Sequence, residues 1–194
     1  MIKVLLLLIF LFPTEALYAD FDFFIESGAL WQNRNDFQIP PSLPGTRVEL
    51  DRYKEGPFLH FRSEAFYRPS KHHGFRLVWA PLTLQIDSDR TSPIHFNGTN
   101  VNAGTNYRFQ YTFNSYRGTY FYSFWGKGDE QLNLGITAKV REAKIRVSQG
   151  NQSESFRNLG LVPLIYFEYQ TKLSENWLFN FQFDGLAGGP GRAF

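Results

Sequence analysis

The sequence predicts an all-β protein, specifically an antiparallel up-and-down transmembrane β-barrel, from three observations. Polar and apolar residues alternate with a period of two in several segments of strand length. Aromatic residues make up 18% of the chain and recur on the apolar side of these segments, while the mean hydropathy is −0.32. After residue 19 no apolar stretch reaches the roughly 20 residues of a membrane helix. A membrane protein with this profile has to cross with strands, whose alternate residues face lipid.

The N-terminal residues resemble a secretory signal. Lys3 is followed by an apolar run over residues 4–12, and Leu17-Tyr18-Ala19 offers a cleavage site before Asp20. The run is too short to span a bilayer as a helix. We therefore expect residues 1–19 to be a cleaved signal peptide and residues 20–194 to form one exported β-barrel domain. An uncleaved anchor and a buried core strand are the alternatives for this run.

Charge and cysteine content exclude two classes of protein. The formal net charge is +2, and removal of the signal segment deletes one Lys and one Glu and so leaves it unchanged. This balance argues against a nucleic-acid partner, which selects a strongly basic surface. The chain contains no cysteine, so disulfides and thiolate metal sites cannot stabilise it.

Four segments show the clearest strand pattern. In the segment 101–114, the row with Tyr107, Phe109, Tyr111 and Phe113 is expected to face lipid, and Arg108 to face the lumen. The other clear segments are 132–141, 159–169 and 177–183. Less regular strands are expected at 23–31, 46–53, 58–67, 74–86 and 118–125. The total is about nine strands, whereas single-chain bacterial barrels have even numbers.

The segment 132–147 changes phase along its length. Apolar residues occupy even positions from Leu132 to Val140 and odd positions from Ala143 to Val147. A β-bulge, or an exit from the membrane, would explain the change.

The connections predict an orientation. Long loops are expected at 33–45 and 148–158, and turns at 68–74, 114–118 and 126–129. Long loops of such barrels lie outside the cell. A periplasmic N-terminus places both long loops outside, and the turns at 55–57 and 126–129 inside. The odd strand count predicts either one miscounted strand or a barrel that is incomplete at the C-terminus, with about 10 to 12 strands when complete.

The polar strand faces carry acids and bases in similar numbers. In a narrow lumen these charges would neutralise one another, because unpaired buried charges are costly. The residues expected in this lumen charge network are Glu26, His60, Arg62, Glu64, Arg108, Lys139, Arg141, Glu168 and Asp184. The same polar faces carry Arg47, Glu49, Asp51 and Arg76. A self-satisfied polar plug is the main interpretation, and a selective pore or a ligand site remains open.

Catalytic and metal-binding interpretations are weaker. Ser63 lies between His60 and Glu64 in sequence, but strand geometry sends it to the opposite face, which removes a local triad. The pair His72-His73 could suggest a metal site, but the sequence indicates no third metal ligand near it, so a solvated loop is favoured. We expect no catalytic residue, no metal and no cofactor.

Four stretches, at 114–117, 135–145, 160–164 and 184–194, resemble a family of functionally uncharacterised outer-membrane β-barrel proteins from Gram-negative bacteria. The resemblance covers most of the chain after Phe24. It implies an outer-membrane location, with membrane lipids and the barrel assembly machinery as partners, and it carries over no catalytic residue. It also implies further strands beyond the segment equivalent to 191–194.

The sequence therefore favours an outer-membrane β-barrel of structural or binding role with a charge-paired polar lumen. The alternatives are a selective pore, an outer-membrane lipid-modifying enzyme, and a soluble exported β-barrel that binds an apolar ligand. In the soluble barrel the aromatic rows would point inward to a core. The orientation of Phe109, Tyr111, Phe179 and Phe181 distinguishes these interpretations.

Overall fold

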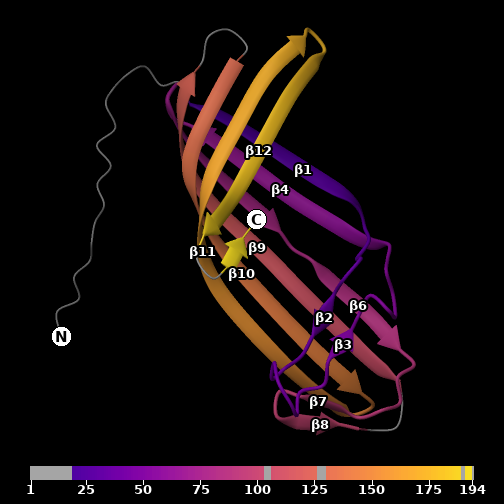
Figure 1. Ribbon diagram of the computed structural model, residues 1–194. Helices are drawn as coiled ribbons and strands as arrows, with labels where there is room; N and C mark the ends of the chain where they lie inside the picture. The colour runs from indigo at the N-terminus through magenta and orange to yellow at the C-terminus, as the bar shows by residue number, and fades with distance from the viewer. Residues whose placement is uncertain (1–18, 103–105, 126–129, 189–190, 194) are drawn as a thin grey trace, which may run out of the picture.

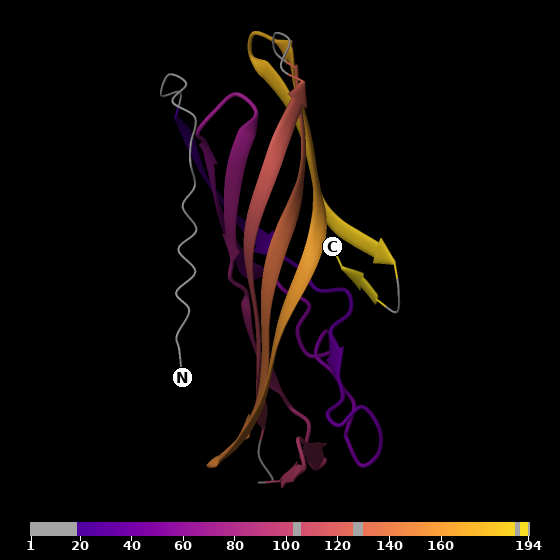
Figure 2. The ribbon, with the colours of Figure 1, turned by 90° about the vertical axis from the view of Figure 1, so that its left-hand side faces the viewer.

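The computed structural model describes residues 19–102, 106–125, 130–188 and 191–193 of the chain. Every regular element in these ranges is a β-strand, and the paired strands are antiparallel. The main sheet curls into a half-barrel (Figures 1 and 2). The predicted all-β antiparallel architecture is confirmed. Within the same residues no helix is long and apolar enough to cross a membrane. The expected signal peptide lies outside the described residues, except for Ala19.

The main sheet follows the chain almost without crossovers, as an up-and-down architecture requires. Its order is β1 (Asp20–Leu30), β4 (Phe58–Arg68), β5 (His73–Ala80), β9 (Tyr107–Trp125), β10 (Glu130–Gln149), β11 (Gln152–Ser174), β12 (Trp177–Gly188) and β13 (Gly191–Ala193). Strand β6 (Thr83–Ser88) continues from β5 and pairs with the first half of β9. Two small hairpins complete the structure: β2 (Asp36–Phe37) with β3 (Val48–Glu49), and β7 (Ile94–Phe96) with β8 (Thr99–Val101).

Four predicted boundaries are wrong. The expected strand 46–53 contributes only the two residues of β3, and the segment 74–86 is divided into β5 and β6. Pro81 lies at this division and has no N–H for the ladder. Residues 107–114 and the segment 118–125 lie in the single strand β9, so the predicted turn at 114–118 is a strand centre; Val101, at the start of the expected strand 101–114, belongs to β8. The expected loop 148–158 is a hairpin in which Gln149 pairs with Gln152.

The two ends of the sheet differ. One end, here called the turn end, is where β4, β9 and β11 finish. The other, the loop end, carries the long segments 31–57 and 89–102 and the hairpin between β10 and β11; it lies at the bottom of Figure 1. The turn at 55–57 was predicted on the side opposite the long loops, and this is wrong. Between the end of β1 and the start of β4 the chain forms only the two short strands β2 and β3, so it does not cross the sheet and the turn stays at the loop end.

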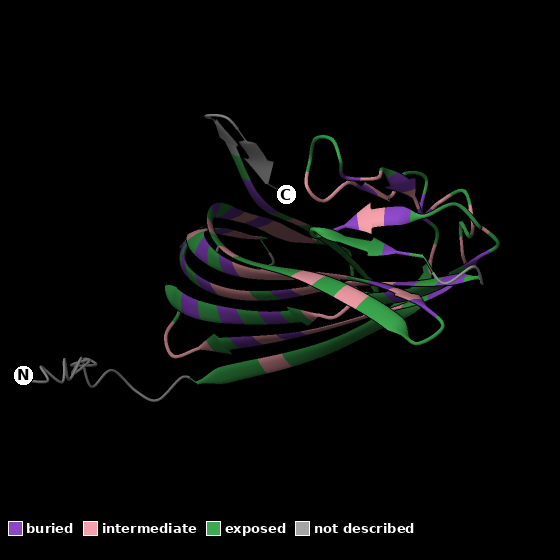
Figure 3. Ribbon diagram, turned by 90° about the horizontal axis from the view of Figure 1, so that it is seen from below, coloured by how far each residue is buried: buried purple, intermediate pink, exposed green. Residues whose placement is uncertain are grey.

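The faces of the sheet exchange polarity between the two ends. In the turn-end half, apolar side chains cover the outer face, and the inner face carries most of the polar ones together with a small buried cluster of Phe66, Phe121 and Tyr166. Buried and exposed residues alternate along these strands (Figure 3). In the loop-end half the inner face is apolar: Leu84, Phe109 and Val147 are buried there, whereas Arg108 and Arg146 are exposed on the outer face. Successive side chains of each strand point to opposite faces along its whole length. The two halves therefore differ only in what each face of the sheet contacts.

The phase change in β10 follows from this exchange. Strand β10 pairs with β11 without interruption from Glu130 to Gln149, and its only register shift toward β9 lies between Leu132 and Asn133. A β-bulge at Arg141 is therefore excluded. Outer-facing Ile136 and inner-facing Val147 are both apolar because their faces meet different surroundings in the two halves.

A hydrophobic core fills the inner side of the loop end, and we call it the loop-end core. Its buried members are Phe37, Val48, Leu50, Phe58, Leu84, Ile86, Ile94, Phe96, Val101, Tyr107, Phe109 and Val147. The ring of Phe37 lies edge-on to Phe96 at 5.5 Å and to Phe109 at 6.0 Å. The expected lipid-facing row of Tyr107 and Phe109 is therefore wrong: this row faces inward, because the loops supply an apolar partner. Ala103, which was assigned to the same row, lies outside the described residues.

Candidate functional site: the polar interior

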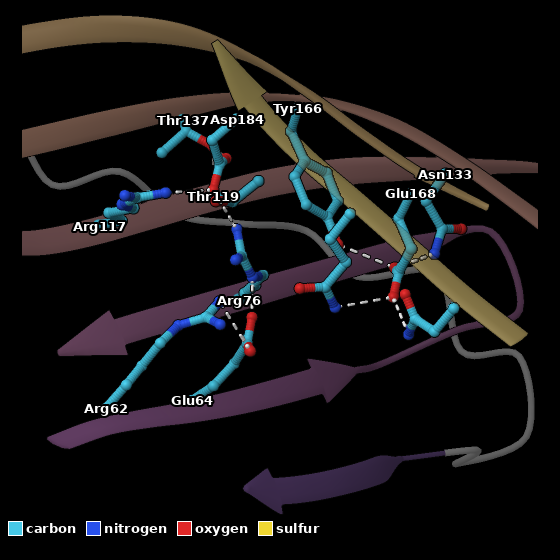
Figure 4. Close-up of polar contacts among 12 residues, drawn as sticks. Arg62, Glu64, Arg76, Arg117, Thr119, Asn133, Thr137, Tyr166, Glu168 and Asp184 are labelled. Atoms are coloured by element: carbon cyan, nitrogen blue, oxygen red, sulfur yellow. Dashed lines mark hydrogen bonds and ion pairs between the residues drawn. The ribbon is translucent and has the colours of Figure 1, made fainter. Parts of the chain in front are cut away.

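The polar interior brings together strands that are not neighbours in the sheet. A carboxylate oxygen of Asp184 on β12 lies 2.8 Å from Nη1 of Arg76 on β5. Four strand spacings separate β5 from β12, which is about 19 Å in a flat sheet. The side chains of Arg and Asp cannot span that distance together. Their contact therefore depends on the curvature of the sheet, and in turn holds it (Figure 4).

Arg76 is the centre of this ion-pair group. Its guanidinium is 1% exposed and donates to both Glu64 on β4 and Asp184. Arg117 on β9 donates to the same oxygen of Asp184 at 2.8 Å. The guanidinium carbon of Arg76 lies over the Tyr166 ring, 4.9 Å from the ring centroid, which adds a cation–π contact. A buried cation needs this degree of compensation, because an unpaired charge in such a site is expensive.

The ion-pair group extends toward the edge strand β1. Arg62 contacts Glu64 at 3.1 Å and Glu26 of β1 at 3.3 Å. On the other side, the hydroxyl of Thr137 donates to the second oxygen of Asp184 at 2.8 Å and lies 2.7 Å from the hydroxyl of Thr119. Charged and hydroxyl groups from β1, β4, β5, β9, β10 and β12 are thus joined in one network.

A second group surrounds Glu168, which is 1% exposed. Its carboxylate accepts hydrogen bonds from the amide of Asn133 at 2.7 Å and from the hydroxyl of Tyr166 at 2.8 Å. The amides of Asn180 and Gln182 donate to its other oxygen at 3.2 and 3.1 Å. Four uncharged donors therefore satisfy this carboxylate. Tyr166 joins the two groups, since it bonds Glu168 and stacks against Arg76 (Figure 4).

Five of the residues expected in the lumen charge network lie within these two groups: Glu26, Arg62, Glu64, Glu168 and Asp184. Lys139 is buried on the same face, in register with Arg117. Arg141 donates to Asn158 at 3.1 Å, closer to the loop end. His60 lies opposite Gly28 of β1 on the inner face. No described contact joins His60 or Arg141 to the ion-pair group.

The predicted interior position of Arg108 is wrong. Its side chain is 68% exposed on the outer face and pairs with Asp87 of β6 at 2.8 Å. The exchange of polarity at the loop end explains this, because polar residues of β9 point outward there. Arg47 and Glu49 also lie outside the interior: they belong to the β2–β3 hairpin, where both contact neighbouring charges on the loop surface.

The expected lumen charge network did not include Arg117, Thr137, Asn133 and Tyr166, although Thr137 and Asn133 were expected on the polar face of their strand. Arg117 was overlooked because 114–118 was assigned to a turn. The available signal was the continuous alternation of small polar residues at Ser115, Thr119 and Ser123 with outward tyrosines. The other three are neutral: Thr137 and Asn133 bond carboxylates that other strands supply, and Tyr166 bonds Glu168 of its own strand.

The described residues do not assemble a catalytic or metal constellation in this interior. His72 and His73 lie on the turn end, where the ring of His72 stacks on Tyr122 and His73 contacts the hydroxyl of Tyr120 at 2.7 Å. Among the described residues, no group of three His, Asp or Glu side chains is placed to hold a metal ion. The arrangement is that of a network whose donors and acceptors satisfy one another.

Comparison with known proteins adds no assignment: no family model, no curated protein and no solved structure matches this chain.

Proposed function

We propose that the chain is an outer-membrane β-barrel protein of structural or binding role, with lipid around its outer apolar face and a charge-paired interior. In this proposal it is exported through a cleaved signal peptide, is folded by the barrel assembly machinery, and belongs to the Gram-negative family that its sequence resembles. The proposal depends on one observation, the inverted polarity of the turn-end half.

Large apolar side chains dominate the outer face of that half. Ile136 is 70% exposed, Leu161 72% and Leu77 65%. The opposite face of the same strands buries Arg76, Glu168 and Asp184. In water such a sheet would be destabilised at both faces, because its outer face would expose apolar area and its inner face would bury charge. Surrounding lipid removes the first cost, and the mutual pairing of the interior charges offsets the second.

The height of the apolar face fits a bilayer. On β10 it extends from Leu132 to Val140, nine residues with a length of about 30 Å at 3.3 Å per residue. A strand tilt of about 40° reduces this to about 23 Å, close to the ≈25 Å band of outer-membrane barrels. At the turn end the band finishes in aromatic rings, among them Tyr122 and Phe124, the residue types that favour a membrane–water boundary.

The alternatives explain fewer of these observations. A free pore needs an open lumen, whereas the loop-end core occupies the inner side at one end and the ion pairs cross the interior near the other. A soluble barrel for an apolar ligand needs an inward apolar face along its length, whereas in the turn-end half the small cluster of Phe66, Phe121 and Tyr166 lies beside the buried charge of Arg76. An enzyme needs a nucleophile or an acid–base group that is open to a substrate, whereas Arg76, Glu168 and Asp184 are buried among their partners.

The proposal is tested by fractionation of cells that express the full-length protein. We expect the mature chain, beginning at Asp20, in the outer-membrane fraction, resistant to extraction by alkaline carbonate and soluble only in detergent. Recovery of a monodisperse protein from the periplasm without detergent would overturn the proposal.

A further inference from the structure

The outer face just beyond the apolar band carries a row of cations. Lys144 and Arg146 lie on β10, Arg157 lies on β11, and Arg108 lies on β9. Lys144 is paired in register with Arg157, so two like charges stand directly opposite each other. Like-charged cross-strand pairs destabilise a sheet. This arrangement therefore costs stability, unless an anion lies over the row.

Anions from the protein compensate only part of this row. Asp87 contacts Arg108 at 2.8 Å, and Glu142 contacts Arg157 at 2.7 Å. The outer face of this half thus has four basic and two acidic side chains among the described residues. No described ion pair involves Lys144 or Arg146. The uncompensated charge is positive and is centred on β10.

We propose that this row, Lys144, Arg146 and Arg157, binds the phosphate groups of anionic lipid headgroups. The inference rests on the proposed membrane location and adds the class of lipid and its site. Leu159 and Leu161 continue the same face of β11 next to Arg157, and they are exposed and apolar. Acyl chains that lie against these leucines would end at the level of the cations, where Lys and Arg side chains form charge-assisted hydrogen bonds to phosphate.

The two boundaries of the apolar band support this assignment. At the turn end, Tyr122 and Phe124 lie on the outer face and contact each other edge to face. Neutral aromatic groups suit a membrane boundary without regard to headgroup charge. Cations occur instead at the loop-end boundary, so the preference for anionic lipid is expected at that boundary.

The test measures lipid preference in vesicles. The full chain is refolded into phosphatidylcholine vesicles that contain phosphatidylglycerol with brominated acyl chains, which quench tryptophan at contact. Trp79 reports on this boundary because it is half-exposed on the outer face. It pairs in register with Tyr116 of β9, which pairs in turn with Val140 of β10, the last apolar residue of the band. We compare the wild type with the K144Q/R146Q variant, and use R34Q/R52Q as the control because both of its arginines are exposed loop residues.

The inference predicts that the wild type prefers brominated phosphatidylglycerol over brominated phosphatidylcholine. The preference should fall about fivefold for each cation removed, the factor that corresponds to about 1 kcal/mol. The R34Q/R52Q control should keep the wild-type preference. High salt should weaken the preference, since the cations are at the surface.

Three outcomes would count against the inference. An unchanged preference in K144Q/R146Q, with normal insertion, would overturn the lipid site and leave the proposed membrane location intact. Loss of the preference on addition of inorganic phosphate, but not of sodium chloride at the same ionic strength, would assign the row to a soluble phosphate compound. Failure of the wild type to insert into any vesicle would overturn the membrane location and the lipid site together.

Discussion

An arginine substitution on the outer face has a different free-energy cost in a membrane protein and in a soluble protein of the same fold. Ile136 lies at the middle of the apolar part of β10, between Leu132 and Val140, and is 70% exposed. In a bilayer this position is the midplane, where an arginine costs about 2–4 kcal/mol. In water, Ile136→Arg would remove exposed apolar area and change stability by about 0.5 kcal/mol or less.

The matched control is Gln85→Arg on β6. Gln85 is exposed on the same outer face beyond the apolar band, where it pairs with Gln110, so arginine there should cost little in either environment. Thr137 cannot serve as the control, because its buried hydroxyl bonds Asp184. The assay is urea unfolding from phospholipid vesicles followed by tryptophan fluorescence. Equal free energies of unfolding for Ile136→Arg and Gln85→Arg would refute the assignment of the lipid face.

Three further predictions concern the interior and the loop end. Arg76→Ala leaves Glu64 and Asp184 without their main partner, so the free energy of unfolding in detergent should fall by about 3–5 kcal/mol; loss of less than 1 kcal/mol would show that the pairs are not structural. Phe109→Ala should cost about 3–5 kcal/mol, measured by the same titration, and make the loops at 31–57 more sensitive to protease, because it opens a cavity in the loop-end core. The wild type and Arg76→Ala should both show only background conductance in planar bilayers; clear single channels from the wild type would favour the pore.

The strand faces of the turn-end half were predictable because they depend on local alternation alone. Ile136, Leu161 and Phe179 face outward as the period of two predicts. The same pattern misassigned Phe109, because alternation reports which residues share a face and not what the face meets. Whether an aromatic row meets lipid or a loop depends on the loops, which have no periodic signal.

The membership of the polar interior was predictable only in part. Charged residues such as Glu64 and Asp184 stand out in a strand, so the sequence indicates them. Their partners depend on curvature: Asp184 meets Arg76 only because the sheet between β5 and β12 is curled. Neutral members such as Asn133 and Gln182 become donors to Glu168 through the register of β10, β11 and β12, which no single strand encodes.

The absence of cysteine permits a direct test of the central claim, that lipid covers the outer face of the turn-end half. Single cysteines at positions 136, 161 and 85 can each carry a spin label in vesicle-inserted protein. Labels at 136 and 161 should be accessible to oxygen, which dissolves in lipid, and protected from a water-soluble nickel complex, while the label at 85 should show the reverse. Equal access of the nickel complex at 136 and 85 would contradict the account.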